Sequence, residues 1–119
     1  SRGLLKPCTV FINDNKMKSM NHLPIHPGEL LKEELEVRGI SQKVFSEKTG
    51  ISYTMLNEIL NCKRPVTSDL SLLFESALGI NSEMLINMQT RHSLAKSRLE
   101  PSMASRISKI RQACASWLL

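Results

Sequence analysis

Four polar side chains recur at helical spacing on one side of a short apolar segment: Tyr53, Thr54, Asn57 and Glu58. No apolar residue shares that side, so these side chains are free to contact a partner. An asparagine can pair with adenine, a glutamate can accept from the cytosine amino group, and a threonine can meet a thymine methyl or a phosphate. The pattern favours a helix that reads a DNA major groove over the alternative of an ordinary solvated helix face.

Basic residues flank this segment on both sides. Lys43 and Lys48 precede it, and Lys63 and Arg64 follow it directly. A lone basic pair is usually plain surface charge, but residues that follow a groove-reading helix lie against the DNA backbone. We therefore interpret Lys63 and Arg64 as phosphate contacts, with Lys43 as a further DNA contact.

Two short helices separated by Gly50 are needed to position these groups. Ser41 and Ser52 can each cap a helix, because a serine hydroxyl accepts a hydrogen bond from an unpaired amide of the first turn. Gly50 suits the positive φ that often follows a helix end, and Ile51 can then turn inward. The expected apolar wedge of this corner comprises Phe45, Ile51, Leu56 and Ile59.

The flanking segments predict further helices. A helix should start at residues 26–29, with Pro27 in its first turn, and end at Gly39. Thr67 or Ser68 should cap the next helix, and Gly79 should end it. Its expected buried stripe is Leu70, Leu73, Ala77 and Leu78. A longer helix should run from Asn81 or Ser82 to Leu99, with Leu85 and Met88 on its apolar side, before Pro101 stops it.

Beyond Pro101, apolar residues recur with the spacing of a helix-pairing seam: Met103, Ile107, Ile110, Cys114 and Trp117. A single helix cannot bury such a seam alone, so it must pack on the domain or on a second copy of the chain. We therefore expect a flexible N-terminal arm over residues 1–24, a DNA-binding domain over 25–100, and a C-terminal amphipathic helix over 101–119 that can serve dimerisation.

Length and composition favour one all-α domain. The chain has 119 residues, 41% of them hydrophobic but only 4% aromatic, so Leu, Ile and Met must fill the interior, which suits helices better than a sheet. The formal net charge of +5 comes from the two ends, and residues 21–100 are near-neutral. Bulk charge thus gives little support for a nucleic-acid partner, and the argument rests on where the basic residues lie.

Several other classes of protein are disfavoured. The three cysteines are widely spaced and lack Cys-x-x-Cys, which argues against a disulfide framework or a zinc knuckle. His22 and His26 have a metal-like spacing, but Pro24 lies between them and no ligand cluster joins them. No phosphate loop or catalytic pattern is present, so we expect no enzyme, no cofactor and no metal. No run is long enough for a signal peptide or a membrane span, which favours a cytoplasmic protein.

The order of helix, Gly-Ile-Ser-Gln, helix, Gly-Ile-Ser, helix and Asn-x-Lys-Arg resembles the lambda-repressor-like, or XRE-type, helix-turn-helix domain. Within that class, the chain is similar to the HigA and VapI antitoxins of plasmid-maintenance modules over residues 25–100. The residues that carry this likeness are His26-Pro27-Gly28-Glu29, Gly39-Ile40-Ser41-Gln42, Asn57-Glu58-Ile59 and Leu85-Ile86-Asn87-Met88-Gln89.

The resemblance implies a dimeric transcriptional autorepressor that binds a palindromic operator and silences a small ribonuclease toxin of the HigB or RelE type. It also implies which residues touch DNA, by their positions in the motif: Gln42, Ser52, Tyr53, Thr54 and Glu58, with Lys63 and Arg64 near the phosphates. Two alternatives are a plain repressor without a toxin, and a protein-interaction module that binds DNA weakly.

Two positions depart from the family pattern. Cys62 replaces the glycine usual after the recognition helix, so this residue must either adopt an uncomfortable φ or rearrange the helix end. Leu85 stands where related antitoxins often carry tryptophan, and residues 101–119 extend past the usual end of the family.

Overall fold

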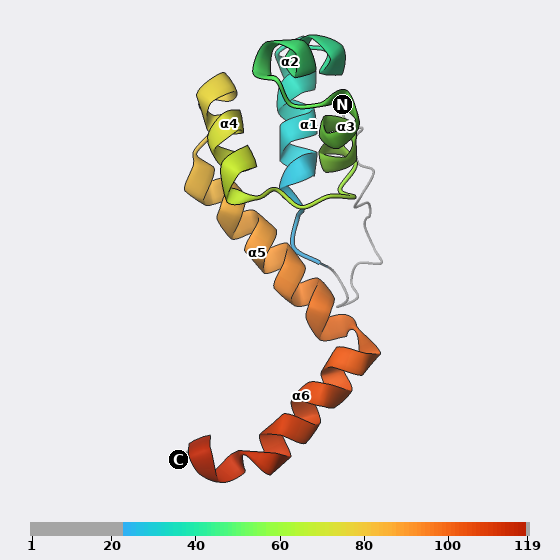
Figure 1. Ribbon diagram of the computed structural model, residues 1–119, viewed down its shortest axis with the longest axis vertical. Coiled ribbons are helices and arrows are strands. Elements are labelled where there is room, and N and C mark those ends of the chain that lie inside the picture. Colours follow the sequence, from blue (N-terminus) through green and yellow to red (C-terminus); the bar gives the residue numbers. More distant parts are fainter. Residues whose placement is uncertain (1–22, 119) are drawn as a thin grey trace.

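The computed structural model describes residues 23–118, and this part of the chain is entirely helical (Figure 1). It contains α1 (Pro27–Val37), α2 (Gln42–Thr49), α3 (Tyr53–Leu60), α4 (Ser68–Leu78), α5 (Ser82–Leu99), α6 (Pro101–Ala113) and a final 3-10 turn, η4 (Ala115–Leu118). The predictions of an all-α class and of an extra C-terminal helix are confirmed. The expected arm over residues 1–24 falls almost wholly outside the described residues.

Side-chain caps fix where the helices begin. Ser41 Oγ accepts from the Val44 amide at 3.1 Å, and Ser52 Oγ accepts from the Met55 amide at 3.0 Å. Thr67 caps α4 and Asn81 caps α5 in the same way. Each cap satisfies an amide of a first turn that has no partner within its helix. The sequence-based expectation of these four caps is therefore confirmed.

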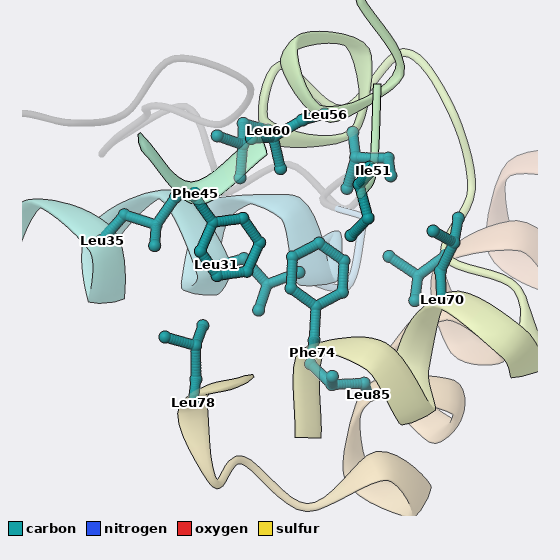
Figure 2. Packing of buried hydrophobic residues seen from close by; sticks show 12 residues of the cluster. Leu31, Leu35, Phe45, Ile51, Leu56, Leu60, Leu70, Phe74, Leu78 and Leu85 are labelled. Carbon is teal, nitrogen blue, oxygen red and sulfur yellow. The ribbon is translucent and has the colours of Figure 1, made fainter. Parts of the chain in front are cut away.

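The core lies among α1 to α5, where every buried apolar side chain of the described chain is found (Figure 2). Phe45 of α2 and Phe74 of α4 stack with ring centroids 5.6 Å apart, which ties the first half of the domain to the second. Leu31 of α1, Leu56 of α3 and Leu85 of α5 are all fully buried around them.

The expected buried stripe of α4 is partly wrong. Leu70 and Leu78 are buried as predicted, but Leu73 is 43% exposed and Ala77 is also exposed. Phe74 takes their place, because residues 70, 74 and 78 follow a strict four-residue repeat and lie on one face of the helix. Phe74 is fully buried on this face, where its ring stacks on Phe45.

Two close contacts hold the C-terminal end of α3 and the loop that follows it. A Cβ added to Gly28 would lie 1.9 Å from the Ile59 carbonyl oxygen, so α1 can approach α3 only with glycine at position 28. Gln89 Oε1 of α5 accepts from the buried Val66 amide at 2.9 Å. The family motif residue Gln89 thus anchors the loop that follows α3.

Cys62 adopts the positive φ that was one of the two expected consequences of having cysteine in place of glycine. Its φ is 63°, and it is the one non-glycine residue with positive φ in the described chain. The helix end is therefore kept and the backbone carries the strain, which is of the order of 1 kcal/mol for a non-glycine residue. Cys62 is also disulfide-bonded, contrary to what the spacing of the cysteines indicated.

The last two helices are less enclosed than the others. α5 is buried only at Leu85 and Gln89, and α6 has no buried residue. Glu100 caps the end of α5, and Pro101 starts α6, which leaves the bundle at an angle (Figure 1). Within residues 23–118, the apolar side of α6 is thus at most half-buried.

His26 links three parts of the domain near the start of α1. It is 4% exposed, its Nδ1 accepts from the Gly28 amide at 2.9 Å, and its ring meets His92 of α5 edge-on with centroids 5.0 Å apart. Burial and, to a smaller extent, the nearby His92 and Lys96 lower the pKa of His26 to about 4, against the opposing effect of a hydrogen bond with the Arg64 backbone. The imidazole is therefore neutral at pH 7.

We predict that His26 makes the fold sensitive to mild acid. The unfolded chain binds a proton at this residue below its ordinary pKa of 6.5, whereas the folded chain does so only near pH 4. The free energy of unfolding should therefore be highest above pH 6.5 and fall by up to about 3 kcal/mol as the pH decreases to 4. Urea unfolding at a series of pH values measures this change.

His26→Asn provides the matched control, because an asparagine oxygen can still cap α1 but does not titrate. Its unfolding free energy should fall less between pH 6.5 and 4 than that of the wild type. Equal pH dependence in the two proteins would contradict the role given to His26.

Candidate nucleic-acid interface

The corner between α2 and α3 is closed by hydrogen bonds from small side chains. Ser46 Oγ donates to the Ile51 carbonyl at 2.6 Å, and Thr49 Oγ1 donates to the Phe45 carbonyl while accepting from the Ile51 amide. Gly50 has a φ of 83°, which lets the chain turn at once into the cap of α3. This corner therefore sets the direction in which α3 leaves α2.

The start of α3 presents exposed polar groups. Tyr53 is 52% exposed, and Ser52 and Thr54 are also exposed. On its other side, α3 buries Leu56, Ile59 and Leu60. Because one side is fixed in the core, the side with Tyr53 and Thr54 must face outward. The first turn of α3 also carries the positive end of the helix dipole, which favours an anionic partner.

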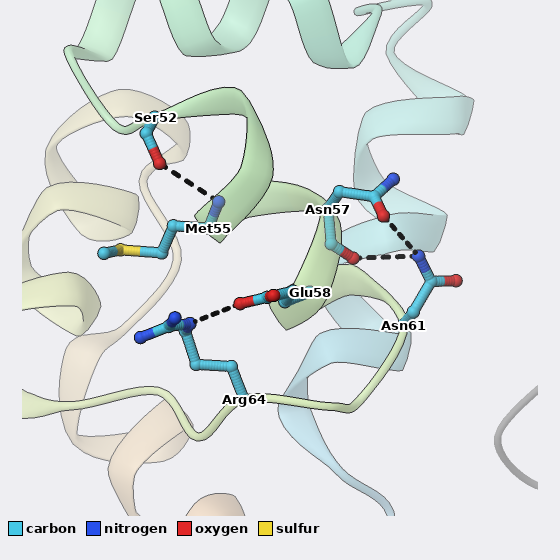
Figure 3. A network of polar contacts seen from close by, with 6 residues as sticks. All are labelled: Ser52, Met55, Asn57, Glu58, Asn61 and Arg64. Atoms are coloured by element: carbon cyan, nitrogen blue, oxygen red, sulfur yellow. Dashed lines mark hydrogen bonds and ion pairs between the residues drawn. The ribbon is translucent and has the colours of Figure 1, made fainter.

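Ser52 stabilises the start of α3 at this surface. Its hydroxyl caps α3 through the Met55 amide (Figure 3). Lys43, in the first turn of α2, is exposed. Gln42 and Lys43 lie at the start of α2, the helix that packs against α3 with its exposed Tyr53 and Thr54. Contact of these residues and of Ser52 with DNA stays a prediction.

Asn57 is placed differently from its exposed neighbours at the start of α3. It is half-buried, and its Nδ2 donates to Gln42 Oε1 at 3.0 Å across the two helices. Asn61 Nδ2 donates to the Asn57 carbonyl at 2.8 Å and to Asn57 Oδ1 at 3.3 Å (Figure 3). Both ends of the Asn57 amide are therefore engaged within the protein.

Glu58 and Arg64 form an ion pair at the end of α3. Arg64 Nε donates to Glu58 Oε1 at 2.9 Å (Figure 3), and the two side chains are 44% and 40% exposed. A pair this exposed is screened by water and contributes at most about 1 kcal/mol. Lys63 is exposed beside it, and its amide donates to the Glu58 carbonyl at 2.8 Å.

Asn61 was not among the predicted site residues, yet it completes the polar cluster with Gln42 and Asn57. Its side chain reaches back by one helical turn to the Asn57 carbonyl, a local bond that asparagine often makes near a helix end. The spacing of four residues between Asn57 and Asn61 was the available signal. No sequence signal indicated the contact between Asn57 and Gln42, which lie 15 residues apart.

The described part of the chain contains no cluster of histidine, cysteine and carboxylate side chains suited to a metal ion. Among these residues, no helix combines the length and the apolar character needed to cross a membrane. The candidate site in residues 23–118 consists of the polar groups of α2, α3 and the following loop.

Comparisons with known proteins give relatives along most of the chain, although no family model matches it. Virulence-associated protein I from Dichelobacter nodosus is 36% identical over 76 residues, which cover 62% of this chain and 70% of that protein. A solved addiction module antidote protein of a HigA family from Coxiella burnetii superposes with a TM-score of 0.62 at 28% identity, over 73% of this chain and 94% of that one.

A second solved structure is the Pseudomonas aeruginosa antitoxin HigA with the higBA promoter. It superposes with a TM-score of 0.62 at 26% identity, over 75% of this chain and 92% of that chain. On these grounds, the chain belongs to the HigA/VapI-type antitoxin family of lambda-repressor-like helix-turn-helix proteins.

Proposed function

We propose that this protein is a dimeric transcriptional autorepressor that binds a palindromic operator in its own promoter. The observation that carries the proposal is the outward side of α3, where Tyr53 and Thr54 are exposed while the opposite side of the helix is fixed in the core. An α-helix held in this way fits a major groove. The HigA relative with its promoter supports the same assignment.

Two kinds of contact follow from this arrangement. Tyr53 and Thr54 reach base edges, and Glu58 lies further along the same side of the helix. Lys43, Lys63 and Arg64 lie at the edges, where phosphates pass, and fix the register of the protein on the duplex. Arg64 reaches a phosphate only if it leaves Glu58, and this exchange is easy because the pair is exposed.

Thr54→Ala and Lys63→Ala test the two kinds of contact against each other. Thr54→Ala should cost about 1–3 kcal/mol of discrimination between the operator and a changed sequence. Lys63→Ala should weaken binding to every duplex alike and reduce the salt dependence by about one unit of slope. Fluorescence anisotropy on operator and scrambled duplexes at several salt concentrations measures both quantities.

Each variant serves as the control for the other, since both residues are exposed and neither fills the core. Unchanged discrimination in Thr54→Ala would remove α3 from base reading. A change of sequence preference in Lys63→Ala at constant slope would contradict its role as a phosphate contact.

We propose that residues 101–119 hold the dimer together. The domain of residues 25–100 folds without them. The exposed apolar side of this segment includes Met103 at 39% exposure, Ile110 at 53% and Trp117 at 81%. Exposure of such a surface to water is unfavourable, and packing against a second copy of the chain would bury it. Two recognition helices on one face of DNA must lie about 34–36 Å apart, so a fixed dimer is required.

Truncation after Glu100 should lower dimer stability and operator affinity together. The shortened chain should still fold, because every buried apolar residue of the described chain lies before residue 100. Sedimentation equilibrium at low micromolar concentration gives the oligomeric state, and circular dichroism checks the helical content. A truncated protein that remains fully dimeric would assign α6 to its own subunit instead.

We further propose that the protein neutralises a small ribonuclease toxin, as the antitoxin family suggests. The exposed acidic residues of α1, Glu33 and Glu36, offer a surface for a basic partner that lies apart from the DNA-reading side of α3. A plain repressor without a toxin is the second candidate, because the features of α2 and α3 serve DNA binding alone.

Co-expression with the neighbouring toxin-sized reading frame, scored by growth and by pull-down, separates the two candidates. The wild type should rescue growth, and Glu33→Lys combined with Glu36→Lys should lose rescue while still binding the operator. Thr54→Ala should show the opposite result. If the charge-reversed variant rescues fully, the toxin binds elsewhere on the protein, and if no partner is toxic, the plain repressor is favoured.

A further inference from the structure

Three amide side chains form one connected relay between the candidate recognition helix and the start of α2: Asn61, Asn57 and Gln42. Asn61 contacts Asn57 at 3.3 Å, and Asn57 contacts Gln42 at 3.0 Å. An amide group carries a donor at one end and an acceptor at the other. The relay therefore has a direction, which depends on which end of each amide faces its neighbour.

A backbone carbonyl sets that direction. Asn61 Nδ2 lies 2.8 Å from the Asn57 carbonyl oxygen, which can only accept a hydrogen bond. The NH2 group of Asn61 must therefore face Asn57. From this position it also donates to Asn57 Oδ1, so the amide oxygen of Asn57 is turned toward Asn61 and its nitrogen away (Figure 3).

The next step fixes Gln42. Since the Asn57 nitrogen can only donate, it must be met by the oxygen of Gln42, as the contact with Gln42 Oε1 shows. The NH2 group of Gln42 then points away from the relay. Gln42 is half-buried in the first turn of α2, next to the exposed Lys43.

We propose that Asn57 is a positioning residue, which holds Gln42 so that its NH2 group donates to a hydrogen-bond acceptor of the operator. The acceptor is a phosphate oxygen or an acceptor atom on a base edge, such as guanine O6 or N7. This inference rests on the proposed DNA-binding function. It assigns to Asn57 an indirect role in place of the adenine contact that sequence analysis considered.

Geometry favours the indirect role. For Asn57 to pair with a base, its amide would have to leave both Gln42 and Asn61, and a half-buried amide deprived of its partners is costly. In its present place it restricts the rotation of Gln42 before DNA arrives. A pre-oriented donor loses less conformational freedom on binding than a free glutamine does.

A double-mutant cycle tests the proposal in the full chain. Gln42→Ala should weaken operator binding roughly five- to tenfold, as expected for one lost hydrogen bond. Asn57→Ala should weaken it by a similar or smaller factor. The double variant should bind like Gln42→Ala, because Asn57 acts only through Gln42. Independent effects that multiply in the double variant would overturn the inference, and so would an unchanged affinity in Gln42→Ala.

Side-chain amide NMR supplies a readout that a purely structural role would not move. In the free protein, the NH2 hydrogens of Asn57 and Asn61 should exchange slowly and those of Gln42 rapidly. Addition of the operator should then protect the Gln42 NH2 group. Protection of the Gln42 NH2 group in the free protein would show the opposite direction of the relay and overturn the proposal.

A panel of operators with single base-pair changes identifies the acceptor. A uniform loss of affinity in Gln42→Ala assigns a phosphate, and a lost preference at one base pair assigns a base edge. Either result supports the donor role of Gln42. A wild-type protein that prefers no promoter sequence would instead refute the proposed operator function, whereas the NMR pattern of the free protein tests the relay separately.

Discussion

The burial of one side of α3 is the constraint on which the rest of the site depends. Leu56, Ile59 and Leu60 are nearly or fully buried, and an eight-residue helix with three such anchors cannot rotate about its axis. The corner bonds from Ser46 and Thr49 then fix its direction. The outward side of α3 is therefore rigid before any partner binds.

Local features of the fold could be predicted because they depend on neighbouring residues. Ser41 and Ser52 cap helices by bonding amides three residues ahead, and Gly50 adopts its positive φ within the same turn. The choice between Leu73 and Phe74 on α4 was different. Helical spacing from Leu70 allows either residue 73 or residue 74 on the buried side. The structure buries Phe74, whose stacking partner Phe45 lies on another helix.

The same division applies to the site. The polar residues of α3 could be recognised from their helical spacing, but their surroundings could not. Spacing placed Asn57 on the outward side with Thr54, whereas a contact with Gln42, on the preceding helix, half-buries it. Such contacts depend on the angle between two helices, and the sequence pattern of either helix does not contain that angle.

The Glu58–Arg64 pair suggests how a near-neutral domain can still bind DNA selectively. A free arginine beside α3 would attract any duplex, since phosphate contacts carry no sequence information. Paired with Glu58, Arg64 must exchange one anionic partner for another, so its gain from any duplex, operator or random, is smaller. Glu58 also repels phosphates, which penalises a helix that meets the backbone instead of the groove. A cost shared by all duplexes does not change their ratio of affinities, so discrimination would rest on the base contacts of α3 and on the penalty that Glu58 places on a misplaced helix.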